Sequence, residues 1–566
     1  MTFSGTIDFR PKLWSAMRHY SAARFKDDLI AGIVVGIVAL PLAIAFGIAS
    51  GVSPTVGLIT AIVGGFIVSA FGGCSVQIGG PTGAFIVIVY NIISLYGLQG
   101  LAIATFMAGI ILVAMGLFHL GTVIKFIPYP IVVGFTAGIA LTIFSTQIND
   151  FLGLGLTDVP GEFIPKWGLF LTNLDRIDWA TVAVSIISLL IITLTPKVSK
   201  KLPGALMAII IVTAAVYIIK VYCPTLNIET IGDRFGNMPT DLPQPKGFEL
   251  SMSVINQLLP SAFTIAILGA IESLLSATVA DGVTGSRTNS NTELIGQGMA
   301  NIIVPFVGGI PVTGAIARTM TNITNGGRTP VAGIIHAIVL LAIFLLLMPL
   351  INMVPMACLA AVLMVVAYNM SGWRTIRAIL HNPKSDISVL LVTFLLTVIF
   401  DLTIAIEIGL LLAVVLFLRR VMENTQVKVY SEQLDVAEGT EATTHEVLDV
   451  AKGVEVYEID GPFFFGVATK FDELMRSSMG ETAVVRIIRM RKVPFIDSTG
   501  IHNLEILIRS SQAKGIHVVL SGVNPAVKTV LEHAGIDRLI GDDHICSHIT
   551  KAVAMANSIV AKNGKC

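Results

Sequence analysis

The sequence predicts an all-α membrane domain with many crossings, followed by a small α/β domain. Hydrophobic residues make up 54% of the 566 residues, and charged residues make up only 13%, about half the share in a soluble protein. The charges are unevenly placed, with 40 in residues 1–421 and 34 in residues 422–566. None occurs from Leu29 to Ile124, a run of 96 residues. We therefore expect a membrane domain over 1–421, a polar linker over 422–450 and a soluble domain over 451–566.

Clusters of Gly and Pro divide the apolar residues into helix-sized segments. A helix rises about 1.5 Å per residue and needs about 20 residues to cross a bilayer, so the uncharged run must fold back on itself. Two of the segments, 82–95 and 314–324, are too short to span. The fourteen expected segments are 28–50, 54–72, 82–95, 100–120, 128–147, 178–196, 203–221, 258–280, 291–307, 314–324, 330–349, 354–370, 385–402 and 404–420.

The lysines and arginines favour one orientation in the membrane. With the N-terminus in the cytoplasm, sixteen of them fall in cytoplasmic segments and five fall outside. This topology also places the C-terminal domain in the cytoplasm. The N-terminus is not a cleavable signal peptide, because the apolar region that follows it is far longer than a signal's core of about 7–15 residues.

Composition and motifs argue against several classes of function. The five cysteines lack the spacing of a zinc site or a disulfide framework. No Gly-Lys-Ser/Thr loop is present to hold nucleotide phosphates, which disfavours an ATP-driven pump. A net charge of zero gives no reason to expect nucleic-acid binding. We expect no enzymatic activity, no cofactor and no metal.

The two short segments begin with related sequences. Pro81–Ala84 reads Pro-Thr-Gly-Ala, and Pro311–Ala315 reads Pro-Val-Thr-Gly-Ala. Pro41 precedes the first by 40 residues, and Glu272 precedes the second by 39. Because seven crossings is an odd number, a second copy of a seven-helix unit would enter the membrane inverted. The pattern therefore predicts a 7+7 inverted repeat with broken third and tenth helices, which is a transporter architecture.

This symmetry predicts a binding site. Two half-helices whose N-termini meet in mid-membrane direct unpaired N–H groups and positive dipole ends to one point, where an anion can bind. The alternative is that the Gly and Pro clusters only kink packed helices. Kinks alone do not explain the matched spacing, so we favour an anion site.

Four motifs resemble those of the sulfate permease family (SulP) of anion transporters, and the resemblance covers essentially the whole chain. They are Leu40–Phe46, Gln77–Phe85, Asn289–Gly298, and Gly308–Pro311 continued by Ala317–Thr319. The resemblance implies core and gate domains, a homodimer and an elevator-like movement of the core. It also implies that the substrate is an anion such as sulfate, bicarbonate or a C4-dicarboxylate. The compact chain is similar to bacterial inner-membrane members.

In the family, the substrate lies between the first, third, eighth and tenth helices. On this chain, that resemblance nominates as substrate-binding residues Phe46, Thr82, Gly83, Ala84, Ser276, Gly314, Ala315, Ala317 and Arg318. Glu272 matches an acidic family position that is linked to cation coupling.

Glu272 and Arg318 each need a reason to lie in the membrane, because a charge there costs about 2.5–3.5 kcal/mol. Apolar surroundings favour the neutral form of a carboxyl group, and a protonated Glu272 would admit an anion that an ionised one repels. We therefore expect proton symport, with sodium coupling as the alternative. Arg318 would add positive charge beside the anion, and Phe46 would offer the positive edge of its ring. The structural alternatives are a Glu272–Arg318 ion pair and simple packing of Phe46.

After residue 450, strands and helices alternate, which predicts a small α/β sheet. Phe495–Gly500 resembles the switch loop of the STAS domain of sulfate transporters and anti-sigma factor antagonists. In the antagonists the serine at the position of Ser498 is phosphorylated, so Ser498 is a candidate regulatory residue. We favour the alternative that it caps the following helix. Strands are expected over 454–459, 483–488 and 516–520, and helices over 467–478, 499–513 and 525–534.

Three functions follow from these patterns. The first is a proton-coupled secondary active anion transporter. The second is an uncoupled anion channel, a voltage-sensitive motor or an exchanger, and the third is an anion-responsive regulator with the STAS domain as its output. A guanidinium can bind two oxygens of sulfate or of a carboxylate, so the sequence does not choose among the anions.

Overall fold

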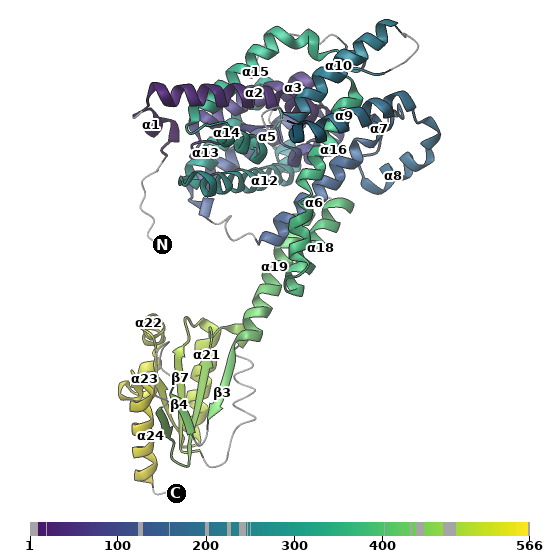
Figure 1. Ribbon diagram of the computed structural model, residues 1–566. Helices are drawn as coiled ribbons and strands as arrows, with labels where there is room; N and C mark the ends of the chain where they lie inside the picture. The colour runs from purple at the N-terminus through teal and green to yellow at the C-terminus, as the bar shows by residue number, and fades with distance from the viewer. Residues whose placement is uncertain are drawn as a thin grey trace. The chain divides into compact units, whose positions relative to one another are not determined.

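A computed structural model describes residues 9–18, 20–122, 128–157, 159–198, 203–222, 228–236, 245, 247–248, 251–400, 402–430, 433–436, 446–467 and 483–563. The chain divides into two compact units, residues 1–413 and 414–566. Figure 1 shows that the first unit is built of helices and that the second contains a sheet.

Most of the first unit is α-helical. Its first helices are α1 (Lys12–Met17), α2 (Ala22–Ala49), α3 (Pro54–Ile59), α4 (Gly65–Phe71), α5 (Ile86–Leu117), α6 (Tyr129–Thr146), α7 (Ile148–Leu152), α8 (Phe163–Thr172), α9 (Trp179–Val198), α10 (Gly204–Tyr222) and α11 (Ile231–Phe235). They are followed by α12 (Met252–Thr284), α13 (Ser290–Ile303), α14 (Ile316–Thr324), α15 (Pro330–Ile351), α16 (Met356–Met370), α17 (Trp373–Ile379), α18 (Lys384–Ile399) and α19 (Leu402–Asn424). Shorter helices are η1 (Thr60–Gly64), η2 (Gly83–Phe85), η4 (Leu174–Arg176) and η5 (Val304–Val307).

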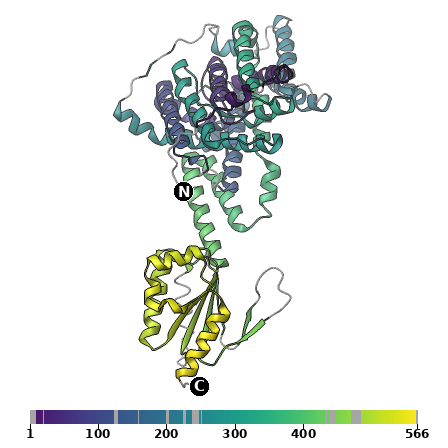
Figure 2. The ribbon, with the colours of Figure 1, turned by 90° about the vertical axis from the view of Figure 1, so that its left-hand side faces the viewer.

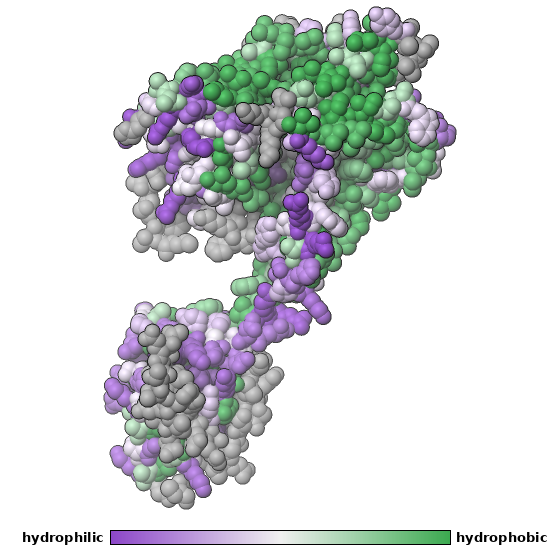
Figure 3. Space-filling model, viewed as in Figure 1, coloured by the Kyte–Doolittle hydropathy of each residue, from purple (hydrophilic) through white to green (hydrophobic). Residues whose placement is uncertain are grey.

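In the described part of the chain, nine helices or helical stretches are long and apolar enough to cross a membrane. Hydrophobic side chains cover much of the visible face of this unit (Figure 3). Exposed hydrophobic side chains of α9 include Ile187 and Leu190. This confirms a multi-pass membrane unit, whereas the number of fourteen segments stays a prediction. Gly97, with a φ of 69°, breaks the helical path of α5 between the expected segments 82–95 and 100–120.

The helices of this unit pack in two groups. In one group α2 contacts α15, and α5 contacts α12 and α13. In the other, α6 contacts α16 and α18, while α9 contacts α10 and α16. The α5–α13 contact is close because two glycines meet there: a Cβ on Gly109 would lie 2.6 Å from the backbone nitrogen of Ile302, and Gly298 faces it.

The second unit contains a five-stranded sheet with the order β3-β6-β7-β8-β9. The β3–β6 pair is antiparallel, and the other pairs are parallel. The strands are β3 (Gln426–Tyr430), β6 (Val454–Asp460), β7 (Val485–Lys492), β8 (His517–Ser521) and β9 (Ile545–Cys546), beside a separate pair β4 (Gln433–Val436) and β5 (Glu446–Asp449). The helices are α21 (Ser498–Ala513), α22 (Pro525–His533), α23 (Ile536–Ile540), η6 (Asp542–His544) and α24 (Ile549–Asn563).

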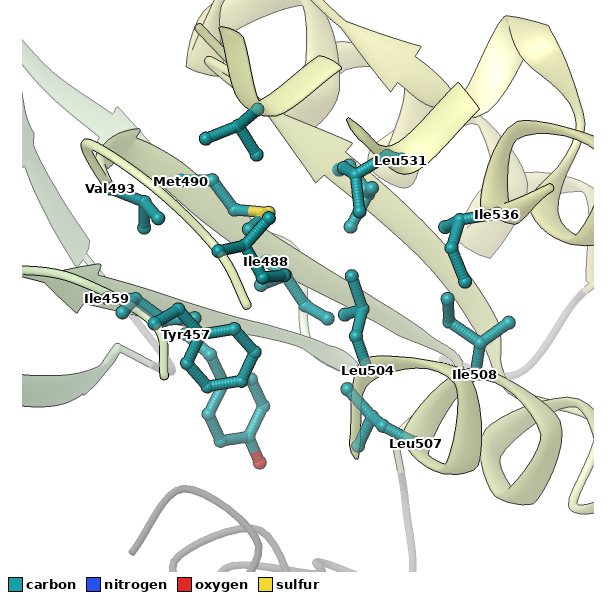
Figure 4. Packing of buried hydrophobic residues seen from close by; sticks show 14 of the residues in the cluster. Tyr457, Ile459, Ile488, Met490, Val493, Leu504, Leu507, Ile508, Leu531 and Ile536 are labelled. Atoms are coloured by element: carbon teal, nitrogen blue, oxygen red, sulfur yellow. The ribbon is translucent and has the colours of Figure 1, made fainter. Parts of the chain in front are cut away.

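Successive residues of the central strands supply two separate cores. Ile488 of β7 packs with Leu504 of α21 and Leu531 of α22 (Figure 4), whereas the adjacent Ile487 packs with Val553 of α24. This alternation is the two-residue period of a strand. It places α21, α22 and α23 on one face of the sheet and α24 on the other (Figures 1 and 2).

The structure differs from the sequence prediction in residues 422–450. The expected linker contains β3, which pairs with β6 from Gln426 opposite Asp460 to Tyr430 opposite Val456. The strand is polar because most of its side chains are exposed, and such a strand resembles a linker in composition. Of the expected helix over 467–478, residues 468–478 lie outside the described residues.

Candidate functional site

Two short strands bring the starts of two helices together. β1 (Gly79–Gly80) pairs antiparallel with β2 (Thr313–Gly314), with Gly79 opposite Gly314. The backbone N–H of Ala315 extends the pairing by donating to the carbonyl of Ile78 at 2.9 Å. Because η2 and α5 follow β1 and α14 follows β2, the two helical N-termini lie side by side, although some 230 residues separate them in the sequence.

Neither helical start is capped by a side chain. Thr82 is the N-cap residue of η2, and Ala315 is that of α14, yet no side-chain oxygen accepts a first-turn N–H at either position. The Thr82 hydroxyl instead donates to Oε2 of Glu272 at 2.9 Å. First-turn N–H groups and the positive ends of the helix dipoles are thus available to an anionic ligand.

Arg318 is a fixed cation behind these helix starts. Its side chain is buried, and its guanidinium donates to the carbonyl of Gly79 at 3.4 Å and to the carbonyl of Pro81. A Cβ on Gly80 would lie only 2.2 Å from Arg318 Nη1, so glycine is required there. In the described structure Arg318 does not pair with Glu272, and the expected structural ion pair between them is wrong because backbone carbonyls hold the guanidinium instead.

One side of α12 supplies both the acidic group and the contacts that hold β2 and α14. Ser273 Oγ lies 2.6 Å from Thr313 Oγ1 and accepts the N–H of Gly314 at 3.2 Å. Ser276 donates to Thr319 Oγ1 at 3.3 Å. Ser276 is fully buried and supports α14 through this bond, whereas Glu272 lines a cavity.

A cavity of about 390 Å³ lies in front of the helix starts. Seven of the residues nominated from the sequence line it, namely Phe46, Thr82, Gly83, Glu272, Ala315, Ala317 and Arg318. Three others do not line it. Ala84 is buried within η2, Gly314 lies within β2, and Ser276 makes the contact with α14 described above.

The opposite wall of the cavity comes from α6 and α16, and sequence reasoning missed it. Thr136 of α6 and Asn369 of α16 are its polar residues, with Phe135 and Met370 as apolar neighbours. These helices belong to the other packing group, so the cavity lies between the two groups. Because this wall lies outside the repeated motifs, no sequence pattern indicated it.

Glu293 of α13 is a second functional residue that the sequence reasoning did not assign. Its fully buried carboxylate accepts the backbone N–H groups of Gly73 and Cys74 at 2.8 and 2.9 Å. It also accepts the side-chain amides of Gln77 and Gln297 at 3.0 and 2.8 Å. Three of these donors, Gly73, Cys74 and Gln77, belong to the segment that leads into β1, so Glu293 fixes that segment against α13. The position of Glu293 within the Asn289–Gly298 motif is the sequence feature that could have identified it.

The loop around Ser498 starts α21 of the sheet unit, and Asp497 is its cap. The Asp497 carboxylate accepts the N–H of Gly500 at 2.8 Å and that of Phe465 at 3.0 Å. Ser498 is the first residue of the helix, and it is exposed. The capping role favoured for Ser498 is therefore wrong, because the preceding aspartate supplies the cap.

Comparisons with known proteins match both units. The model of the sulfate permease family matches residues 25–393, and the STAS domain model matches residues 447–552. The putative sulfate transporter YvdB of Bacillus subtilis is 41% identical over 531 residues, which cover 94% of this chain and 97% of YvdB. The bicarbonate transporter BicA of Synechocystis sp. is 30% identical, with coverage of 91% of this chain and 92% of BicA.

A solved structure shows the same fold. The overall structure of SLC26A9 superposes with a TM-score of 0.85 at 18% identity, covering 97% of this chain and 93% of that chain. The predicted fold class, a mostly helical membrane domain with a C-terminal STAS domain, is confirmed.

We predict that Gly80→Ala weakens anion binding at least tenfold, because the added methyl group must displace the Arg318 guanidinium. Equilibrium binding of labelled sulfate and bicarbonate to the purified chain measures the effect. Gly282→Ala on α12 is the matched control, since no atom of the described residues lies within 4 Å of its added Cβ. Equal binding in both variants would show that Arg318 does not act on the anion.

For the sheet unit, we predict that Asp497→Ala lowers stability by about 1 kcal/mol through loss of the helix cap. Ser498→Ala should leave stability unchanged, because the Ser498 side chain is exposed and makes no cap. Thermal melting and limited proteolysis of the full chain compare the two variants. A larger loss in Ser498→Ala than in Asp497→Ala would contradict the assignment.

Proposed function

The chain belongs to the sulfate permease family, and from that premise we propose that it is a secondary active transporter of a small anion, coupled to protons. The observation that carries the proposal is the meeting of two uncapped helix starts, a fixed guanidinium and a carboxyl group at one cavity. The charge asymmetry of the sequence supports cytoplasmic termini. The resemblance of the compact chain to bacterial members of the family supports a bacterial inner membrane as the setting. A homodimer is part of the same proposal.

In this proposal the anion lies against the first turns of η2 and α14. Backbone N–H groups near Gly83 and Ala317 donate to it, and both residues line the cavity. Arg318 adds a positive charge that is already oriented by the Gly79 and Pro81 carbonyls, so binding does not require the guanidinium to be ordered. Phe46 closes the apolar side of the cavity.

Glu272 is the proposed proton carrier. Its carboxylate lines the cavity in which the anion is proposed to bind, and an ionised carboxylate there repels a second negative charge. A proton on Glu272 removes the repulsion, so anion and proton bind together. Thr82 links the proton site to the proposed anion site, because its hydroxyl donates to Glu272 from the N-cap position of η2.

The position of the cavity supports alternating access by an elevator-like movement. One wall comes from α2, α12 and the helix starts, and the other comes from α6 and α16. Sliding of the first helix group against the second would carry the anion and Glu272 together. The wall with Thr136 and Asn369 would then be exchanged for another surface during transport.

Sulfate, bicarbonate and C4-dicarboxylates are the proposed substrate classes. The named relatives include a putative sulfate transporter and a bicarbonate transporter. All these anions carry oxygens that suit N–H donors and a guanidinium.

Uptake into proteoliposomes tests the function directly. Labelled sulfate, bicarbonate, succinate, aspartate and fumarate are offered with and without an inward proton gradient. We predict that one class accumulates only with the gradient. Accumulation driven by sodium alone would contradict proton coupling, and equilibration without any gradient dependence would indicate a channel or exchanger.

The Glu272→Gln variant tests the coupling residue. Wild-type uptake should rise as the pH falls, because protonation of Glu272 admits the anion, whereas the variant should bind anion independently of pH and lose proton-driven accumulation. Glu162→Gln is the control, since Glu162 is exposed and lies outside the cavity. Wild-type pH dependence in Glu272→Gln would remove Glu272 as the carrier.

A further inference from the structure

A large apolar groove lies on the other side of α16 from the anion cavity. Its volume is about 870 Å³, and its walls come from α6, α9, α16, α17 and α18. Almost all of its lining is hydrophobic, including Ala140, Met364 and Leu391. The side chains of Phe144 and Leu391 are 38% and 46% exposed, so the groove is open on one side.

The groove is set within the membrane-spanning helices. α6, α9 and α16 all belong to stretches that are long and apolar enough to cross the bilayer. Met364 lies six residues before the end of α16, which corresponds to a depth of about 9 Å along the helix. An opening of this kind in a bilayer faces hydrocarbon chains, not water.

One end of the groove is polar, and two exposed arginines of α17 follow its lining residues in the sequence. Tyr368, Ser371 and Trp373 line that end, and the exposed aromatic rings are typical of a membrane interface. Arg377 lies one helical turn after Trp373, on the same face of α17, and Arg374 is adjacent. Neither guanidinium forms an ion pair with any residue in the described ranges. The charge here suits an anionic headgroup.

We propose that this groove binds the acyl chain of an anionic phospholipid whose phosphate is held by Arg374 and Arg377. The long apolar groove fits a flexible chain, and the two arginines, which are neighbours of the lining residues Trp373 and Ile376 in α17, favour phosphatidylglycerol over phosphatidylcholine. α16 separates this lipid from the anion cavity, and Asn369 lines both. The bound lipid therefore packs against the helix that forms the far wall of the anion cavity.

Native mass spectrometry of the purified full chain tests the proposal, with phosphatidylglycerol and phosphatidylcholine of identical acyl chains as probes. We expect the wild type to retain phosphatidylglycerol in preference to phosphatidylcholine. The double variant Arg374→Gln/Arg377→Gln should retain about tenfold less phosphatidylglycerol. Ala140→Trp should retain none in the groove, because the indole fills it. Controls are Arg176→Gln and Ile338→Trp, which change an exposed charge and an exposed apolar surface elsewhere. Equal retention in Ala140→Trp and wild type would overturn the proposal.

A second measurement needs no bulky substitution. The Trp373 fluorescence in vesicles is obtained as the difference between the wild type and Trp373→Phe. Phosphatidylglycerol with brominated acyl chains should quench this fluorescence more strongly than phosphatidylcholine with the same brominated chains. Equal quenching by both lipids would overturn the headgroup assignment. If Leu391→Cys cross-links two copies of the chain and Ala140→Trp leaves lipid retention unchanged, the groove is occupied by a second chain. That combination would overturn the proposal.

Discussion

The antiparallel pairing of β1 with β2 is the constraint on which the proposed site depends. Extended backbone within a membrane domain has no water to bond, so each of its polar groups needs a partner. Side chains of α13 and α14 supply several of those partners. Asn301 bonds both backbone groups of Val312, at 2.8 and 2.9 Å, and Asn322 donates to the carbonyl of Val76 at 2.8 Å. Thr319 accepts the N–H of Ile78 at 3.1 Å.

These contacts explain why so many polar residues are buried in an apolar chain. Asn301, Asn322 and Glu293 are all fully buried, and each bonds the segment that leads into one of the two strands. Once the extended segments are satisfied in this way, the first turns of η2 and α14 remain uncapped. The free hydrogen-bonding capacity is thereby concentrated at the cavity, where we propose that the anion binds.

Most of the candidate site could be predicted from the sequence, because the repeated motifs mark the two helix starts. Pro81 and Pro311 predicted both breaks, and Glu272 stood out as a charge in an apolar helix. The wall with Thr136 and Asn369 could not be found in this way, because polar residues in apolar helices without a repeat do not reveal which cavity they face. The partners of Arg318 were missed for another reason. Backbone carbonyls leave no pattern in a sequence. The sequence therefore indicated only an acidic side chain, that of Glu272, as a structural partner for Arg318.

In the sheet unit, the alternation of strands and helices was enough to predict the fold class. β3 was read as a linker because an exposed strand at a sheet edge has the composition of a polar connection. At the start of α21, Asp497 and Ser498 are both strong capping residues. Only the geometry distinguishes them, since Asp497 binds the N–H groups of both Gly500 and Phe465.

The central claim is that anion and proton bind together at the helix starts. The proton stoichiometry of anion binding tests it most directly. Sulfate, bicarbonate and fumarate are each titrated into the purified chain in weak buffer while proton uptake is recorded. We predict that the wild type takes up about one proton per anion bound, and that Glu272→Gln binds the anion without proton uptake. Binding by the wild type without proton uptake would contradict it.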